Sequence, residues 1–537
     1  MSFRANQHQQ ISLFDHKNWL TEREQKVLEK SWAKVFADEI FPAIDETRFS
    51  VLYSDKASRP NTPVNIIVGA LIIKELFDLS DDEVVENLML DIHLQYALHT
   101  TSYEEQPLND KTLSRFRKRC YDYERNYGID LFHDCICDLN NKIAKMMNIN
   151  SHIKRMDSLM IEANIKKMSR VELLYTCVAN LAKHIYKTDK NMLSEVLLHY
   201  CDPDDRNLVI YHSRNIDVNT RINIIINEAD ELIKICKGDF CEVDEYKLLL
   251  RCLKEQTIID SGIRRIRDKG DELPSPKSLQ SPYDPEATFR TKAGKKHVGY
   301  IANVVETVSE SGSVITDYQY EENVYADSRF LGDYIERTEP QEETMTIVAD
   351  GGYVGQSNRD AASKKNIEIV NTALMGTPVP DIYADFVISE DGKQVIQCPC
   401  GHKPIRCHYI ETSKQIKSYF SCENCVNCSY KNECNAKIRK SSVLIPISHS
   451  AVERAKQQRQ IAADDFQNWR RIRNGVEAVP SILRNMFNVD KIPVHGKIPS
   501  KFFFGSKISA LNFRKLFRHR KGFVLHPVNP LLTKNAS

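Results

Sequence analysis

The 537-residue sequence predicts a multidomain α+β protein. Helical periodicity fills residues 18–150, strand-like runs alternate with short helices from residue 287 onward, and seven of the 15 cysteines lie between Cys398 and Cys434. The hydrophobic fraction of 42% and the charged fraction of 27% are typical of globular proteins. A chain of this length favours three or four domains.

Several classes of protein are disfavoured by the same sequence. No stretch approaches the roughly 20 consecutive apolar residues that cross a bilayer. The first 19 residues lack the basic head and apolar run of a secretory signal. We therefore expect a cytoplasmic protein with no membrane partner and with reduced thiols.

Charge is unevenly distributed along the chain. The net charge is only +1, which disfavours a purely electrostatic nucleic-acid binder. After residue 450, however, Lys and Arg outnumber Asp and Glu by 17 to 5. This excess suits either a phosphate-binding surface or an ordinary solvated basic surface.

Residues 1–150 are expected to form a helical N-terminal domain. A broad apolar helical face follows Pro63, and Ser80 with Glu83 gives a capping-box pattern. Asn109 is the expected N-cap of a basic helix. This order suits a DNA-binding domain resembling a helix-turn-helix, and equally a helical bundle with a polar exterior. The candidate DNA contacts in the basic helix are Arg115, Arg117 and Arg119.

Residues 151–375 are expected to form the first part of a mixed α/β core. A short strand ends at Asp157, and an apolar strand ends at Asp350 before a glycine-rich turn. A helical insertion occupies about 166–275. The remaining elements are strands at 287–292, 296–308, 313–323 and 367–374 and a helix at about 357–365.

Two further segments complete the predicted organisation. Residues 376–445 form a cysteine-rich, metal-binding insertion. Residues 446–537 form the C-terminal part of the core, with one long helix at roughly 450–487 and an apolar-basic helix at 508–521.

Three acidic residues, Asp157, Asp350 and Glu477, stand out by their positions. Two carboxylates on adjacent strands and one on a packed helix can hold two Mg²⁺ ions about 3.5–4 Å apart. Magnesium prefers oxygen ligands, which carboxylates provide. A single Asp at a strand end is more often a turn former and a single Glu on a helix a surface charge, so the indication comes from their order and context.

The segments RMDSLMIEANI, IVADGGY and RRIRNGVEAVPSILR resemble the signature of DDE transposases from bacterial insertion sequences. The resemblance is to the four/five superfamily and its eleven-eighty-two-like group. That family carries a Tyr-Arg-Glu-Lys signature with two, three and six residues between its members. Here Arg473, Glu477 and Arg484 stand at this spacing, and Arg470 occupies the tyrosine position. On one helix these four residues would share a face.

The resemblance implies an RNase H-like core and a two-metal reaction. Asp157, Asp350 and Glu477 would bind two Mg²⁺ or Mn²⁺ ions, while Arg470, Arg473 and Arg484 would contact DNA. The enzyme would cleave DNA at the ends of an insertion sequence and transfer the freed strand into target DNA. It would act as a homodimer on paired terminal inverted repeats and would be nucleoid-associated when bound.

Two alternatives remain open at the level of sequence. The first is a nuclease with the same core that cuts without strand transfer. The second is a catalytically silent, zinc-containing DNA-binding relic, which the presence of all three carboxylates disfavours.

The cysteine-rich segment has the layout of a zinc ribbon, in which two close pairs of thiolates face each other. Cys398 and Cys400 would form one pair, and either Cys425 with Cys428 or Cys422 with Cys434 the other. An iron–sulfur cluster on Cys422, Cys425, Cys428 and Cys434 is the alternative, although it leaves the first pair without a role.

Overall fold

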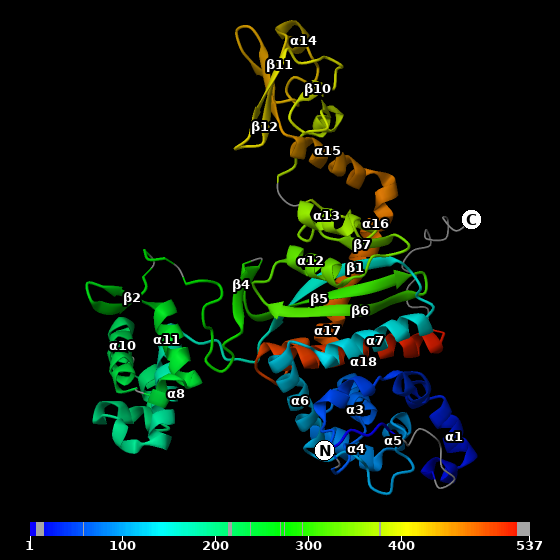
Figure 1. Ribbon diagram of the computed structural model, residues 1–537, viewed down its shortest axis with the longest axis vertical. Helices are drawn as coiled ribbons and strands as arrows, with labels where there is room; N and C mark the ends of the chain where they lie inside the picture. Colours follow the sequence, from blue (N-terminus) through cyan, green and yellow to red (C-terminus); the bar gives the residue numbers. More distant parts are fainter. Residues whose placement is uncertain are drawn as a thin grey trace. The chain divides into compact units, whose positions relative to one another are not determined.

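The computed structural model describes residues 1–6, 15–56, 58–212, 217–236, 238–268, 270–272, 274–292, 294–374 and 377–522 (Figure 1). It divides into two compact units. The first contains Met1–Ser151, Asp157–Phe330 and a segment that starts at Val476, and the second contains His152–Met156 and Leu331–Gly475. The domain borders given above from the sequence remain a prediction.

The chain begins with helices. The predicted capping box is confirmed, because the Ser80 hydroxyl accepts from the Glu83 N–H at 3.1 Å and the Glu83 carboxylate accepts from the Ser80 N–H at 2.6 Å. Asn109 is not the N-cap: its side chain accepts from the Lys111 N–H, so the basic helix begins later. The helices are α1 (Glu22–Glu29), α2 (Trp32–Val35), α3 (Val64–Phe77), α4 (Asp81–Leu90), α5 (Ile92–Ala97), α6 (Thr112–Tyr127) and α7 (Leu131–Met146).

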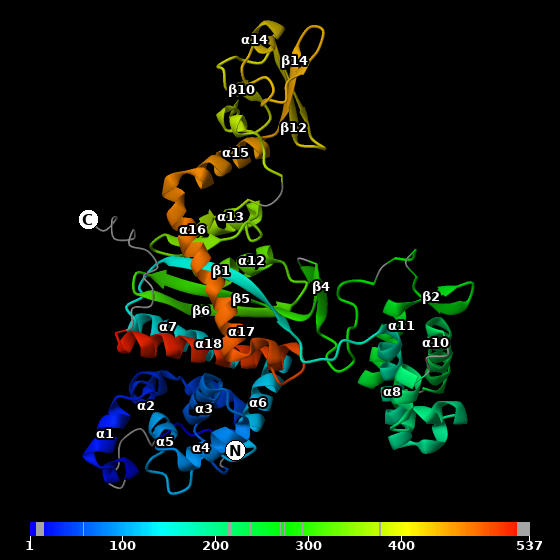
Figure 2. The same ribbon diagram turned by 180° about the vertical axis from the view of Figure 1, so that it is seen from behind.

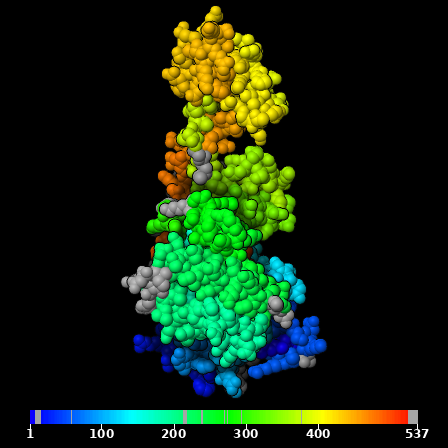
Figure 3. Space-filling view, turned by 90° about the vertical axis from the view of Figure 1, so that its left-hand side faces the viewer, coloured from blue at the N-terminus to red at the C-terminus, as the bar shows by residue number. Residues whose placement is uncertain are grey.

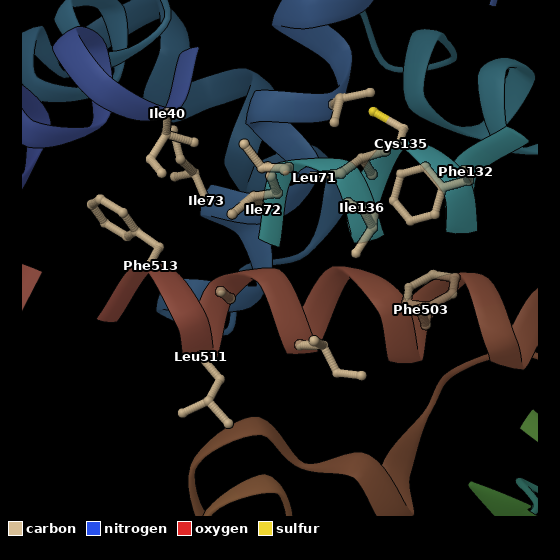
Figure 4. Packing of buried hydrophobic residues seen from close by; sticks show 14 of the residues in the cluster. Ile40, Leu71, Ile72, Ile73, Phe132, Cys135, Ile136, Phe503, Leu511 and Phe513 are labelled. Carbon is tan, nitrogen blue, oxygen red and sulfur yellow. The ribbon is translucent and has the colours of Figure 1, made fainter. Parts of the chain in front are cut away.

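The core of the first unit forms around α18 (Lys497–Arg520), the last described helix. Figure 4 shows its apolar side chains against those of α3 and α7. Phe132 of α7 and Phe502 of α18 stack with their ring centroids 3.6 Å apart. A C-terminal helix therefore completes the core of the N-terminal helices, which raises the apolar area that both bury.

The basic residues of α18 are paired with acids inside the first unit. Lys507 forms a buried ion pair with Glu75, and Lys515 lies 2.8 Å from the fully buried Glu306. Further pairs are Lys497 with Glu321, Lys501 with Glu124 and Asp130, and Arg520 with Glu39. Five of the 17 cations after residue 450 therefore pair with acids of the first unit, and two of these acids, Glu75 and Glu306, are buried and would be costly to bury unpaired.

Strands of the first unit form antiparallel ladders: β4 (Thr288–Lys292) pairs with β5 (Lys295–Ser309), and β5 pairs with β6 (Gly312–Glu322). The strand predicted to end at Asp157 continues, since β1 spans Ile153–Glu162. That prediction was wrong because Leu159 and Ile161 extend the alternating apolar pattern and are buried.

The helical segment between β1 and β4 has a hydrophobic core of its own, and Figure 3 shows it in turquoise to green on the face turned to the viewer. It ends in a hairpin, within the range that was predicted to be helical. Ser261 and Gly262 at its turn both have positive φ, the conformation that two-residue hairpins require. The elements are α8 (Arg170–Thr188), α9 (Asp205–Asn207), α10 (Val218–Ile235), α11 (Asp244–Gln256), β2 (Thr257–Asp260) and β3 (Ile263–Ile266).

In the second unit the first residues of β1 pair in parallel with β7 (Met345–Ala349), which pairs in parallel with β8 (Ile367–Asn371). The strand order of the sheet is β4-β5-β1-β7-β8, with β6 beside β5. The sheet is therefore mixed, as predicted. Its accompanying helices are α12 (Asp327–Arg337) and α13 (Gln356–Ser363).

The cysteine-rich segment folds into two small sheets around a separate core. The four-stranded sheet has the order β11-β12-β14-β13. The elements are β9 (Val387–Ile388), β10 (Val395–Gln397), β11 (Arg406–Ile410), β12 (Gln415–Phe420), α14 (Cys422–Val426), β13 (Lys437–Ile438) and β14 (Val443–Ile447).

The single helix predicted for 450–487 is three helices, α15 (His449–Ala462), α16 (Gln467–Asn474) and α17 (Ala478–Phe487). Ala463 is extended, with ψ of 147°, and a 3-10 turn at Gly475–Glu477 separates α16 from α17. Aspartates after Ala463 and the glycine at 475 have low helix propensity. The four motif residues at 470–484 therefore do not share one continuous α-helical face. No helix among the described residues has the length and apolar character needed to span a membrane.

Candidate catalytic site

The two aspartates occupy equivalent positions after paired strand residues. Arg155 of β1 pairs with Val348 of β7 in the parallel ladder. Asp157 stands two residues beyond Arg155, and Asp350 stands two residues beyond Val348. Both carboxylates are partly exposed, and each accepts a hydrogen bond from the N–H of the following residue, at 2.9 Å for Asp157 and 2.6 Å for Asp350. These contacts fix the orientation of both side chains.

The turn after β7 has the predicted form. Strand β7 ends at Ala349, and a turn at 351–353 follows Asp350 directly. The Tyr353 ring is buried, and the Tyr353 carbonyl accepts from Asn358 of α13 at 3.0 Å. The loop that carries Asp350 is thereby anchored to the next helix.

Arg155 is a positioning residue that the sequence analysis missed. Its side chain is only 3% exposed, and Nη1 donates to the Ile472 carbonyl of α16 at 2.9 Å. A Cβ atom on Gly475 would lie 2.1 Å from the same nitrogen, so a larger residue there would displace the Arg155 guanidinium. Because strand side chains alternate, Asp157 lies on the same face of β1 as Arg155.

Helix α16 packs against the rest of the second unit through an apolar face. Ile472 and Phe466 join Val348 and Val370 in one buried cluster, with Trp469 packed against it. Two motif arginines, Arg470 and Arg473, are partly exposed on the same helix.

Glu477 is exposed and ends the 3-10 turn before α17. Within the first unit, Arg484 of α17 donates to the Met160 carbonyl of β1 at 2.8 Å and to Asp490 at 3.1 Å. Figure 2 shows α17 crossing β1. Arg484 therefore attaches the helix that follows Glu477 to the strand that carries Asp157.

The three N-terminal arginines have different surroundings. Arg117 is buried, bonds both carboxylate oxygens of Asp81, and lies 5.2 Å from the Phe503 ring centroid. Arg115 is exposed, and Arg119 is partly exposed beside the Tyr53 ring. Arg117 thus links helices of the core, whereas Arg115 and Arg119 face solvent at least in part.

Six of the clustered cysteines are neighbours. Cys400 and Cys428 have their sulfur atoms 3.4 Å apart. Burial, together with Cys428, Cys398, Cys400 and Cys425, raises the pKa of the Cys434 thiol to about 12. Burial, together with neighbouring thiols that include Cys422, also raises the pKa of the Cys425 thiol. The Cys422 sulfur lies 3.9 Å from the Arg439 carbonyl, whereas Cys407 belongs to β11. Among the described residues, a group of three ligand atoms all within 4.8 Å of one another occurs elsewhere, at His133, Cys137 and Asp317.

Two family models match the chain. Residues 22–119 match the family described as "Transposase domain (DUF772)", and residues 397–517 match the family described as "Transposase DDE domain". The chain belongs to the DDE-type insertion-sequence transposases. No curated protein and no solved structure matches this transposase.

The matched ranges cover part of the predicted site. The DDE match includes Glu477, the three motif arginines and every clustered cysteine, whereas Asp157 and Asp350 lie outside both matches. The DDE match also covers the cysteine-rich segment from residue 397 onward. The group within the family remains a prediction.

Replacing Arg155 with Met should destabilise the transposase. The change removes the buried donor to the Ile472 carbonyl, and an unsatisfied buried group costs about 1–3 kcal/mol. The midpoint of urea unfolding should fall relative to wild type. Arg471→Met, an exposed change on α16, is the control, and an equal effect of both changes would contradict the positioning role of Arg155.

Proposed function

We propose that the transposase hydrolyses the phosphodiester at each end of its insertion sequence and joins the freed 3′-hydroxyl to target DNA. Asp157, Asp350 and Glu477 are the proposed ligands of two divalent metal ions. The family match supports the reaction class, and the contacts around Arg155 support this choice of acids.

One observation carries the assignment. Arg155 pairs with Val348 on one side, and its guanidinium lies against Gly475 on the other. Each proposed ligand stands two residues beyond one of these three positions: Asp157 beyond Arg155, Asp350 beyond Val348 and Glu477 beyond Gly475. Because β1 and β7 run parallel, the same step of two residues gives Asp157 and Asp350 equivalent positions on their strands, which supports grouping them as ligands.

The fold supports the same proposal. The strand order β6-β5-β1-β7-β8, in which β7 and β8 run parallel to β1, is the order expected of an RNase H-like core. Asp157 lies in β1 beyond the residues that pair with β7, Asp350 directly follows β7, and Glu477 lies in the helical segment after β8. We therefore propose that this sheet is the RNase H-like core and that the cysteine-rich segment is inserted into it.

The chemistry of the three side chains fits magnesium, because carboxylate oxygens are the ligands it prefers. When bound, the two ions supply Lewis acidity to the attacking and leaving oxygens. The protein's own contribution is to fix the carboxylates through β1, β7 and α17 and to bind DNA phosphates. Arg470, Arg473 and Arg484 are the proposed phosphate contacts at the site, with Arg115 and Arg119 as further contacts.

Two element ends must react together, so we propose a homodimer on paired inverted repeats. Each subunit would then supply one set of acids to one end. Oligomeric state in the presence of end DNA, measured by light scattering, tests this step separately from catalysis.

Asp157→Asn, Asp350→Asn and Glu477→Gln should each abolish cleavage. Each change removes a charged metal ligand, and we expect end cleavage to fall by at least ~100-fold, as when transition-state charge loses its stabilisation. The measurement uses purified full-length protein, Mg²⁺ and duplexes carrying the element's own boundaries. Glu368→Gln, an exposed acid on β8, is the control and should cleave normally.

The same assay separates the transposase from its rivals. Joined products that carry the labelled end support strand transfer, whereas nicked products alone indicate a nuclease. Cleavage by an acid variant at the wild-type rate would contradict the ligand assignment.

We also propose a structural zinc ion in the cysteine-rich segment. Four thiolates at tetrahedral Zn–S distances of about 2.3 Å lie about 3.8 Å apart, close to the 3.4 Å between Cys400 and Cys428. The ligands would come from Cys398, Cys400, Cys422, Cys425, Cys428 and Cys434, whose thiols influence one another.

Cys400→Ser and Cys428→Ser should each remove one equivalent of zinc from the protein, because a structural site needs all four ligands. Cys407→Ser is the matched control and should retain it. Metal analysis of each purified variant measures the outcome. Zinc retained by Cys428→Ser would contradict the ligand set, and iron with visible absorption would favour the cluster alternative.

A further inference from the structure

A histidine, a cysteine and an aspartate meet between α7 and β6, outside every site discussed above. His133 and Cys137 are one helical turn apart on α7, and Asp317 belongs to β6. The His133 Nε2 lies 3.4 Å from the Cys137 sulfur and 3.2 Å from the Asp317 Oδ1, and the sulfur lies 3.5 Å from the same oxygen.

An irregularity in the sheet explains why the aspartate reaches α7. Val305 of β5 pairs with Asp317, but the next residue, Glu306, pairs with Ile315. One extra residue in β6 forms a bulge, which redirects the side chains beside it. As a result both Asp317 and its neighbour Tyr318 contact the His133 ring.

The three separations match those of ligands bound to one zinc ion. Tetrahedral zinc with N, S and O ligands at about 2.0–2.3 Å places these atoms about 3.4–3.6 Å apart. The observed distances of 3.2–3.5 Å lie within about 0.2 Å of that range. Agreement in all three distances is stronger evidence for a metal site than the presence of these residue types alone.

The surroundings also suit a metal ligand. The other ring nitrogen of His133, Nδ1, lies 3.3 Å from the Asp134 carboxylate. A histidine that binds a metal usually donates from its second nitrogen to such a group, which fixes the ring. The side chains of His133 and Asp317 are each 17% exposed, so an ion could enter from solvent.

We propose that His133, Cys137 and Asp317 bind a zinc ion that joins α7 to the sheet. This site is separate from the cysteine-rich segment and from the three catalytic acids. His133 Nε2 also lies 2.9 Å from the Tyr318 carbonyl, a contact that by itself would connect α7 to β6 through a hydrogen bond.

The test begins from the Cys400→Ser/Cys428→Ser double variant, which removes the other zinc site. This full-length protein should retain about one zinc per chain and should show a thiolate-to-metal band after cobalt substitution. Adding Cys137→Ser should remove both signals. Adding Cys135→Ser, the same change at a buried residue of α7, should remove neither.

A second variant keeps the test independent of folding. Asp134→Asn changes an exposed side chain and should weaken zinc affinity by about 10- to 100-fold in chelator competition, as expected for a lost outer contact. No zinc in the double variant, or zinc retained after Cys137→Ser, would overturn the proposal and leave a hydrogen-bonded link only.

A different observation concerns one face of the sheet β11-β12-β14-β13. Arg406 pairs with Tyr419, and its guanidinium lies 4.3 Å from the ring centroid, while that of Arg439 lies 5.8 Å from it. Lys417 stands two residues before Tyr419 and shares its face. The opposite face of β12 is buried and consists of Ile416, Ser418 and Phe420.

These cations have no acidic partners. Arg406, Lys417 and Arg439 form no ion pair within the described part of the chain, and residues 397–447 contain eight Lys and Arg against three Asp and Glu. Uncompensated cations around an aromatic ring attract phosphates and bases. We infer that this face binds the backbone of duplex DNA, an inference that rests on the proposed function for its partner.

The triple variant Arg406→Gln/Lys417→Gln/Arg439→Gln should bind duplex DNA of unrelated sequence more weakly. The slope of log affinity against log salt should become shallower by about 0.9 for each lost contact, about 3 in total. Lys403→Gln/Lys414→Gln/Lys431→Gln removes equal charge from the same segment as the control. An unchanged slope, or an equal change in the control, would contradict the inference. Failure of the proposed function would appear differently, as wild-type protein that binds DNA without cutting it.

Discussion

The parallel pairing of β1 with β7, fixed from one side by the buried guanidinium of Arg155, is the constraint on which the candidate site depends. This one side chain donates to the Ile472 carbonyl and lies against Gly475. A single buried group thereby connects β1 to α16. A buried charge is stable only when it is hydrogen-bonded, so the contact resists small displacements.

The sequence indicated the strands and the acids because both leave local signals. The apolar run before Asp350 and the glycines after it predict a strand and its turn, and the structure has both. The capping box at Ser80 is equally local. The sheet order was predicted only as mixed, since which strands are neighbours depends on contacts distant in sequence.

Other features could not be read from the sequence because tertiary contacts decide them. The strand continues past Asp157 because Leu159 and Ile161 are buried, which depends on their tertiary contacts. The break at Gly475 coincides with a glycine of low helix propensity that lies against the Arg155 guanidinium. Likewise Arg117 resembled a DNA contact by its neighbours in sequence, whereas Asp81 and Phe503 hold it in the core.

The distribution of charge likewise depends on tertiary contacts that the sequence does not show. The basic excess after residue 450 is real, yet α18 uses its cations to neutralise acids from α3, α6 and β5. The cations that lack acidic partners include those on the sheet of the cysteine-rich segment. Composition alone therefore locates positive charge poorly, because a buried ion pair and a DNA-binding surface contain the same residue types.

The proposed catalytic and structural metal sites differ in the chemistry of their ligands. Carboxylates select hard ions such as magnesium, which keep bound water and exchange readily. Thiolates and imidazole select zinc, which stabilises a fold. Asp157 and Asp350 are partly exposed, whereas the clustered cysteines range from the buried Cys398, Cys425 and Cys434 to the exposed Cys400. Exposed oxygen ligands would let the proposed catalytic ions reach a DNA strand, whereas the proposed structural zinc needs only four thiolates close together, whatever their exposure.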